Sequence, residues 1–176
     1  ALPILLGVPV LALPALSHPA DDRGGTGFLI PNLQYTKNNG LEIATPFYVL
    51  FGPNKDLTVT PHIYSDVAPL LQADYRHLTG TGAYQISGYG TYGKRLSTSN
   101  PTLPAFSDFR GYLEGSGRFQ LDRRWSLSGS ARVATDRTFL RRYDISRDDR
   151  LRSTVNLERI TRSSYLSISG WAFQTL

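Results

Sequence analysis

The feature that most constrains this chain is a period of two in its apolar residues, repeated in segments of about ten residues. Within 41–51, apolar side chains fill alternate positions, and within 56–64 Leu57, Val59 and Ile63 alternate with Thr58, Thr60 and His62. Successive side chains of a strand point to opposite faces. The pattern therefore predicts strands that have one apolar and one polar face.

Turn residues separate these segments. Asn38-Asn39-Gly40 is a strong hairpin signal because these residues tolerate positive φ, and similar turns are predicted near 52–55, 79–82, 122–124 and 161–163. Two connections, 94–108 and 136–149, are too long for tight hairpins, so we expect them at the rim opposite the short turns. We predict about nine strands between residues 26 and 176.

Strand length and surface chemistry indicate the class of sheet. Strands of ~9–11 residues with alternating faces and alternating short and long connections are typical of an outer-membrane β-barrel. A soluble sandwich has shorter strands and usually carries lysine and glutamate on its outer faces, whereas this chain has three lysines. We therefore predict an all-β antiparallel meander that forms part of a large transmembrane barrel. Nine strands do not close such a barrel, because bacterial barrels use even strand numbers.

The opening segment is the most apolar part of the chain. Prolines interrupt residues 1–16 throughout, which argues against a helix, and no basic segment precedes them as in a signal peptide, although a signal-peptide core stays an alternative. No run of 18 apolar residues occurs, so no membrane-spanning helix is expected. Because the chain contains no methionine, we expect a processed protein or an excised segment.

Catalytic chemistry finds little support in the sequence. The chain has no cysteine, and His18, His62 and His77 lack the spacing of a metal site. No nucleophile elbow or phosphate-binding loop is present. We expect no catalytic residue, no metal and no cofactor, although a Ser–His pair assembled across strands would leave no local motif.

Several motifs, in order along the chain, resemble the lipopolysaccharide-assembly outer-membrane protein LptD. They are Pro19-Ala20-Asp21-Asp22-Arg23, Gly27-Phe28-Leu29-Ile30-Pro31, Asn39-Gly40-Leu41-Glu42-Ile43, Pro46-Phe47-Tyr48, Asp56-Leu57-Thr58-Val59-Thr60-Pro61, Arg76-His77-Leu78, Thr135-Asp136, Phe139-Leu140-Arg141-Arg142-Tyr143, Leu151-Arg152-Ser153 and Phe173-Gln174-Thr175-Leu176. Gly24-Gly25 and Ala68-Pro69 depart from the family pattern.

The resemblance implies a domain organisation and partners. Residues 1–18 would be the last strand of a periplasmic β-jelly-roll, 19–25 a linker, and 26–176 the N-terminal portion of the barrel. The implied cargo is lipopolysaccharide, and the implied partners are an LptE-like plug lipoprotein, an LptA-like periplasmic bridge protein and the outer-membrane bilayer of a Gram-negative bacterium. No nucleic-acid partner is expected.

Prolines lie inside three predicted strands, at Pro31, Pro46 and Pro61. Proline has no N–H to donate to a ladder and is normally restricted to edges and bulges. The resemblance implies that Pro31 and Pro46 weaken a lateral gate through which the acyl chains enter the membrane while the sugars cross the lumen. The alternative is that the prolines mark bulges or bends, which we expect to suit Pro61 better.

The basic residues concentrate in one half of the chain. Residues 94–162 hold 15 of the 19 basic side chains and 8 of the 14 acidic ones. Arg118, Arg132 and Arg152 fall on polar faces and are candidate contacts for lipopolysaccharide phosphates, because guanidinium groups pair with phosphate oxygens. A solvated lumen wall with Arg–Asp pairs is the simpler interpretation.

We therefore predict a non-enzymatic component of an outer-membrane lipopolysaccharide translocon. A porin-class channel is the first alternative, and a long loop folded into the lumen would favour it. A barrel hydrolase is the second, and a Ser–His pair within hydrogen-bonding distance would favour that one.

Overall fold

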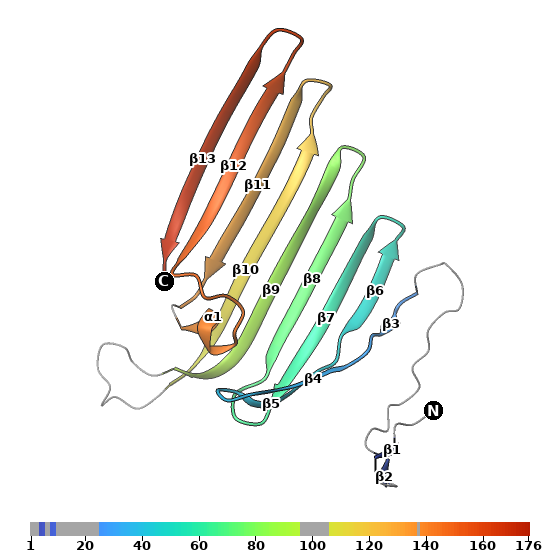
Figure 1. Ribbon diagram of the computed structural model, residues 1–176, viewed down its shortest axis with the longest axis vertical. Helices are drawn as coiled ribbons and strands as arrows, with labels where there is room; N and C mark the ends of the chain where they lie inside the picture. Colours follow the sequence, from blue (N-terminus) through green and yellow to red (C-terminus); the bar gives the residue numbers. More distant parts are fainter. Residues whose placement is uncertain (1–3, 6–7, 10–24, 96–105, 137) are drawn as a thin grey trace.

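The computed structural model describes residues 4–5, 8–9, 25–95, 106–136 and 138–176. Nearly all of the described chain from Gly27 onward forms one antiparallel sheet (Figure 1). Its strands are β3 (Gly27–Phe28), β4 (Asn32–Thr36), β5 (Gly40–Ala44), β6 (Phe47–Gly52), β7 (Lys55–Tyr64), β8 (Leu70–Leu78), β9 (Gly82–Arg95), β10 (Phe106–Gln120), β11 (Trp125–Ala134), β12 (Arg150–Ile160) and β13 (Tyr165–Thr175). The one described helix is the single turn α1 (Phe139–Arg142).

These eleven strands form nine strand lines, in agreement with the predicted number. From β7 to β13 each strand pairs with its neighbours in chain order, whereas β7 pairs with β5 over one part of its length and with β6 over another. In the same way, β4 pairs with β5, and β3 with β6. The first strand line is thus β3 plus β4, and the second is β5 plus β6.

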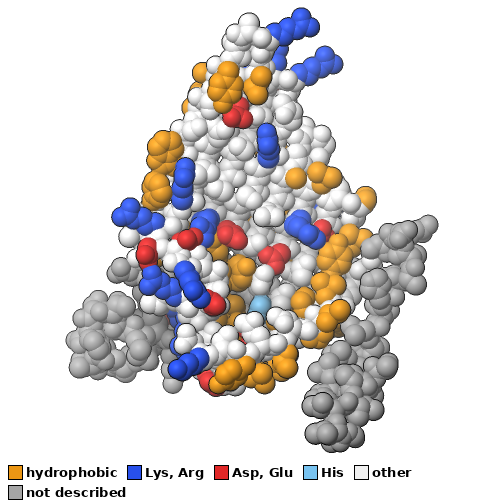
Figure 2. All heavy atoms as spheres, in the orientation of Figure 1, with side chains coloured by type: hydrophobic (Ala, Val, Ile, Leu, Met, Phe, Trp, Pro, Cys, Tyr) orange, Lys and Arg blue, Asp and Glu red, His pale blue; other side chains and the backbone are white. Residues whose placement is uncertain are grey.

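The two faces of the sheet differ in chemistry as the alternation predicts. One cross-strand row reads Thr58, Asp74, Ser87, Glu114 and Arg132 and belongs to what we call the polar face. The adjacent row on the other side, the apolar face, reads Val59, Ala73, Gly88, Leu113 and Val133. Figure 2 shows the molecule from its polar side, where acidic and basic side chains are scattered and hydrophobic ones gather at the margins.

The apolar face is largely uncovered. Large hydrophobic side chains more than half exposed are found on it from β7 to β12, among them Ile63, Leu71, Val133 and Val155. A soluble sheet would bury such a face against a second layer. Among the described residues, no helix is both long enough and apolar enough to cross a membrane.

From β6 onward, short turns lie at one rim of the sheet and longer connections at the other, whereas the tight β4–β5 turn lies at the rim with the longer connections (Figure 1). Tight turns join β6 to β7, β8 to β9, β10 to β11 and β12 to β13. Arg95 pairs with Phe106 at the opposite rim, so the predicted connection after residue 94 begins there. Residues 96–105, which make up most of it, lie outside the described residues.

The β4–β5 hairpin turns at the predicted Asn38-Asn39-Gly40. Gly40 has φ +74°, and a Cβ there would lie 1.9 Å from the Ser65 hydroxyl oxygen. Both the positive φ and the close approach require glycine.

The buried core is a small cluster at the rim with the long connections. Phe139, Leu140 and Leu151 are fully buried, and Tyr64 and Tyr112 pack with them. This core therefore joins the connection after β11 to the ends of β7, β10 and β12.

Most of the predicted N-terminal organisation lies outside the described residues. In residues 1–18, only β1 (Ile4–Leu5) and β2 (Val8–Pro9) are described, and they pair with one another. The jelly-roll strand at 1–18 stays a prediction. The same holds for the linker at 19–25, of which Gly25 alone is described, and for His18.

Candidate functional site

The first candidate site is the pair of interrupted strand lines. The first line is interrupted at residues 29–31, between β3 and β4, and the second at residues 45–46, between β5 and β6. Pro31 and Pro46 occupy these two interruptions. Both prolines thus lie where the ladder stops, as expected for residues that lack an N–H donor.

The first line contains one extra residue at this point. Phe28 pairs with Phe47 on one side of the interruption and Asn32 pairs with Ala44 on the other, so three residues oppose two. This is the residue count of a β-bulge, a feature that bends a strand and locally disrupts pairing. The alternative of a bulge therefore describes Pro31, and its role in a lateral gate stays a prediction.

Missing donors lie on both sides of the second line. The Leu29 N–H donates to the Pro46 carbonyl oxygen at 2.9 Å, and the Thr45 N–H donates to the Pro61 carbonyl oxygen at 3.2 Å. In a regular antiparallel pair the partners exchange two such bonds. Pro46 and Pro61 cannot return the second bond, so each pair keeps one.

The expectation that Pro61 marks a bulge or bend does not agree with its register. Pro61 lies within the continuous strand β7 and pairs with Leu71 without any shift. The Thr45 bond to its carbonyl shows that the backbone of Pro61 faces the second strand line, so this is the side that lacks an N–H. The ladder is already interrupted there, and proline is tolerated. Pro61 thus belongs with Pro46 in weakening this part of the sheet.

A contact between Glu42 and His62, called the clamp below, lies on the polar face beside the interruption. The ladder between β5 and β7 holds only three residue pairs, of which Glu42–Tyr64 and Ala44–His62 are the outer two. His62 Nδ1 lies 2.6 Å from a Glu42 carboxylate oxygen, and both side chains are largely buried. This contact ties the short strand β5 to β7.

The clamp extends onto β8. His62 Nε2 lies 3.0 Å from the Gln72 amide oxygen, and the Gln72 amide nitrogen donates to Asp74 at 2.7 Å. Both imidazole nitrogens therefore lie within hydrogen-bonding distance of side-chain oxygens. A chain of side-chain contacts thus runs from β5 across β7 to β8.

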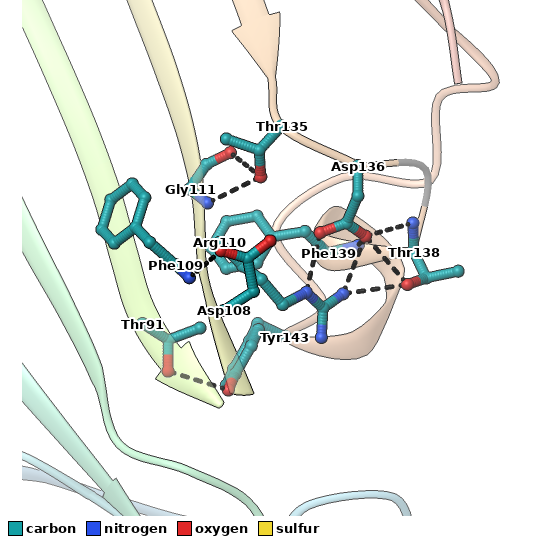
Figure 3. A network of polar contacts seen from close by, with 10 residues as sticks. All are labelled: Thr91, Asp108, Phe109, Arg110, Gly111, Thr135, Asp136, Thr138, Phe139 and Tyr143. Carbon is teal, nitrogen blue, oxygen red and sulfur yellow. Dashed lines mark hydrogen bonds and ion pairs between the residues drawn. The ribbon is translucent and has the colours of Figure 1, made fainter. Parts of the chain in front are cut away.

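The second candidate site is the connection between β11 and β12, which folds back onto the polar face. Its first anchor is a buried pair in which the Arg110 guanidinium donates to both carboxylate oxygens of Asp136, at 2.7 and 2.8 Å (Figure 3). Asp136 also accepts hydrogen bonds from the Thr138 and Phe139 N–H groups, each at 3.0 Å. Burial raises the pKa of Asp136, but the bonds from Arg110 and Thr138 outweigh it and lower this pKa to about 2.

Two further contacts hold the same connection. The Tyr143 hydroxyl donates to the Ala68 carbonyl oxygen at 3.1 Å, in the connection between β7 and β8. Near its other end, Asp148 accepts from Arg132 at 2.8 Å, which lowers the pKa of Asp148. The connection is therefore fixed to three different parts of the wall and covers the polar face at this rim.

The three predicted phosphate contacts do not come together. Arg118 is exposed and pairs across the ladder with Ser128, four residues from Arg132, a separation of about 13 Å along the strand. Arg132 is already engaged by Asp148 and by the Tyr112 hydroxyl at 2.7 Å. Arg152 is exposed and lies opposite Phe173. Arg–Asp pairing, the simpler interpretation, therefore describes Arg132.

The described residues offer little to a hydrolase or a metal. No group of three potential metal ligands occurs within them. His62 contacts Glu42 and Gln72, and His77 Nδ1 contacts the Tyr84 hydroxyl at 3.1 Å. Neither histidine has a serine partner in this part of the chain.

Sequence reasoning missed the Glu42–His62 and Arg110–Asp136 pairs. The residues of each pair are separated by 20 and 26 positions, and only the strand register brings them together. The run after Asp136 was recognised as a motif, but its role as the buried anchor of a connection was not.

The comparisons with known proteins all match this chain to proteins of one name. Residues 108–176 match the model of the family LptD, described as LPS transport system D. LPS-assembly protein LptD of Psychrobacter cryohalolentis is 34% identical over 170 residues, which are 90% of this chain and 15% of that protein. The protein of the same name from Pectobacterium atrosepticum is 34% identical over 136 residues, 76% of this chain and 17% of that protein. The one from Acinetobacter baumannii is 44% identical over 82 residues, 46% of this chain and 10% of that protein. The chain thus spans less than a fifth of these relatives.

Proposed function

Since this chain is homologous to a segment of LPS-assembly protein LptD, we propose that it forms part of the wall of an outer-membrane barrel that delivers lipopolysaccharide to the outer leaflet. The observation that carries the proposal is the two-faced sheet: an uncovered apolar face for lipid and a polar face, rich in charged and hydroxyl side chains, for a watery lumen. Binding and passage, without covalent chemistry, are the proposed activity.

The interrupted strand lines support a gate in this wall. In lipid an unpaired backbone group costs several kcal/mol, since no water replaces the lost partner. Pro31, Pro46 and Pro61 remove donors within one short stretch, where the β3–β6 ladder has two residue pairs and the β5–β7 ladder three. We propose that these two lines are the moving part of the gate. The stretch from β7 to β13 would stay fixed.

Among the arginines, Arg118 is the best candidate contact for cargo phosphate. It is exposed on the polar face near the short-turn rim and takes part in no ion pair among the described residues, whereas Arg132 is held by Asp148. A plug lipoprotein and a periplasmic bridge protein are proposed partners of the complete protein.

The experiment depletes the complete protein from its Gram-negative host. Lipopolysaccharide at the cell surface is then measured by labelling intact cells. We expect surface lipopolysaccharide to fall while its synthesis continues. Normal surface levels after depletion would contradict the proposal.

A porin-class channel is the second candidate, because one observation favours it: the connection after β11 folds onto the polar face. Ion conductance of the purified complete protein in planar bilayers tests this function. Steady, large conductance without any effect on lipopolysaccharide would favour the channel.

A further inference from the structure

The apolar face carries few charged side chains. From β7 to β11, and on β12 from Val155 onward, its described charged side chains are Lys55 and Arg159, and each lies beside a short turn. The described cations of this part of the face thus lie at its short-turn rim.

Arg159 lies against an aromatic ring. It pairs across the ladder with Trp125, and its guanidinium carbon is 5.8 Å from the centre of the Trp125 ring. A guanidinium stacked on a ring keeps its N–H groups pointing outward, where they can form paired bonds to phosphate oxygens. Both side chains are half-buried, so the stack is held in place.

Further arginines lie in the two turns next to this contact. Arg123 and Arg124 lie in the turn before β11, and Arg162 lies in the turn after β12. The two turns are adjacent, because the Ile160 N–H donates to the Arg124 carbonyl oxygen at 2.9 Å. Figure 2 shows basic side chains projecting from this end of the molecule.

The nearby acidic groups have other partners. Asp122 accepts hydrogen bonds from the backbone N–H groups of Arg124 and Trp125, at 2.6 and 2.8 Å. Glu158 accepts from the Tyr165 hydroxyl at 3.0 Å and belongs to the polar face. Backbone hydrogen bonds and the charges of Arg124 and Arg159 lower the pKa of Asp122, but four arginines outnumber these two acids and leave a net positive charge at this rim.

We infer that Arg159, stacked on Trp125, together with Arg124 and Arg162, binds the phosphate headgroup of an anionic phospholipid in the leaflet at the short-turn rim. This inference rests on the proposed function, because it requires the apolar face to meet lipid. The next row along that face, Phe119, Leu127, Leu157 and Ile168, lies where the acyl chains of the same lipid would pack. Charge and apolar surface are thus continuous in the order that a phospholipid requires.

The test uses the complete protein reconstituted in vesicles of phosphatidylcholine with phosphatidylglycerol. Retained phosphatidylglycerol is counted by native mass spectrometry after gentle detergent extraction. We expect Arg159→Gln to weaken retention about tenfold, the loss expected for one charge-assisted contact, and Arg159→Lys to have a smaller effect. Arg147→Gln removes an exposed arginine of the long connection and serves as the charge-matched control.

Equal retention by the wild type and Arg159→Gln would overturn the inference, as would an equal loss in Arg147→Gln. Flotation of the wild type with vesicles and its lipopolysaccharide delivery are measured in parallel. A wild type that does not enter vesicles would overturn the proposed function and this inference together. One that enters vesicles and delivers lipopolysaccharide, with equal retention in both forms, would overturn the inference alone.

Discussion

The imidazole of His62 lies 2.6 Å from the Glu42 carboxylate. His62 pairs with Ala44 in the last ladder pair before the interruption that contains Pro46. A side-chain contact thus holds the second strand line to β7 where the backbone pairing of β5 stops. The two strands are therefore joined by a bond that exists independently of the ladder.

The first prediction concerns this clamp. In His62→Gln the imidazole that contacts both Glu42 and Gln72 is lost, so β5 should separate from β7 more often. We expect amide hydrogen exchange in residues 40–44 of the complete protein to become about tenfold faster, while β8 is unchanged. His77→Gln, which alters the other described histidine of the strands, is the control. Equal exchange protection of β5 in the His62 variant and the wild type would show that the clamp does not stabilise the pairing of β5 with β7.

The second prediction concerns the prolines. Replacing Pro31, Pro46 and Pro61 together with alanine restores three N–H groups, which should strengthen pairing of the first two strand lines, each bond contributing about 1 kcal/mol or more. We expect less lipopolysaccharide at the cell surface at equal amounts of folded protein. Pro53→Ala, in the turn before β7, changes a proline outside the ladder and should leave delivery unchanged. Unaltered delivery by the triple variant would remove the proposed gate role.

The third prediction concerns the buried pair of Figure 3. Asp136→Asn leaves the buried Arg110 guanidinium without its charged partner, and the loss of one member of a buried pair costs about 3 kcal/mol. We expect residues 138–145 to lose exchange protection and to become accessible to added protease. The exposed pair of Arg147 and Asp144 provides the control, since Arg147→Gln should cost little. Protease resistance of the Asp136 variant equal to that of the wild type would contradict the assigned anchor.

The fourth prediction concerns acid. The pKa of Asp136 is lowered from 3.8 to about 2 in the folded protein. A depressed pKa means that the carboxylate stabilises the fold above pH 3.8 and that this contribution is lost as the pH falls toward 2. The connection after β11 should therefore keep its exchange protection from neutral pH down to about 4 and lose it below that. In Asp136→Asn the exchange protection should be low at every pH. If this variant loses as much protection between pH 4 and pH 2 as the wild type does, another group causes the transition.

The alternation of side chains determined much of the fold by itself. Strand positions, the two faces, the hairpin at Gly40 and the opposite rims of short and long connections all depend on local properties. Because proline lacks an N–H wherever it lies, the sequence also predicted missing donors at Pro31 and Pro46, although it did not predict that both strand lines are interrupted there. The resemblance quoted from its motifs agrees with the homology found over most of the chain.

Tertiary structure alone decided which side chains meet. The one-residue offset opposite Thr45 and the direction of the missing donor of Pro61 depend on register, which is a property of paired strands and not of one segment. The sequence left Arg132 as a candidate phosphate contact or a member of an Arg–Asp pair, and the folded connection supplies Asp148 to it. Partners such as Arg110 and Asp136 are joined only when distant strands pair and the connection closes over them, because hydrogen bonds act over about 3 Å and not along the chain.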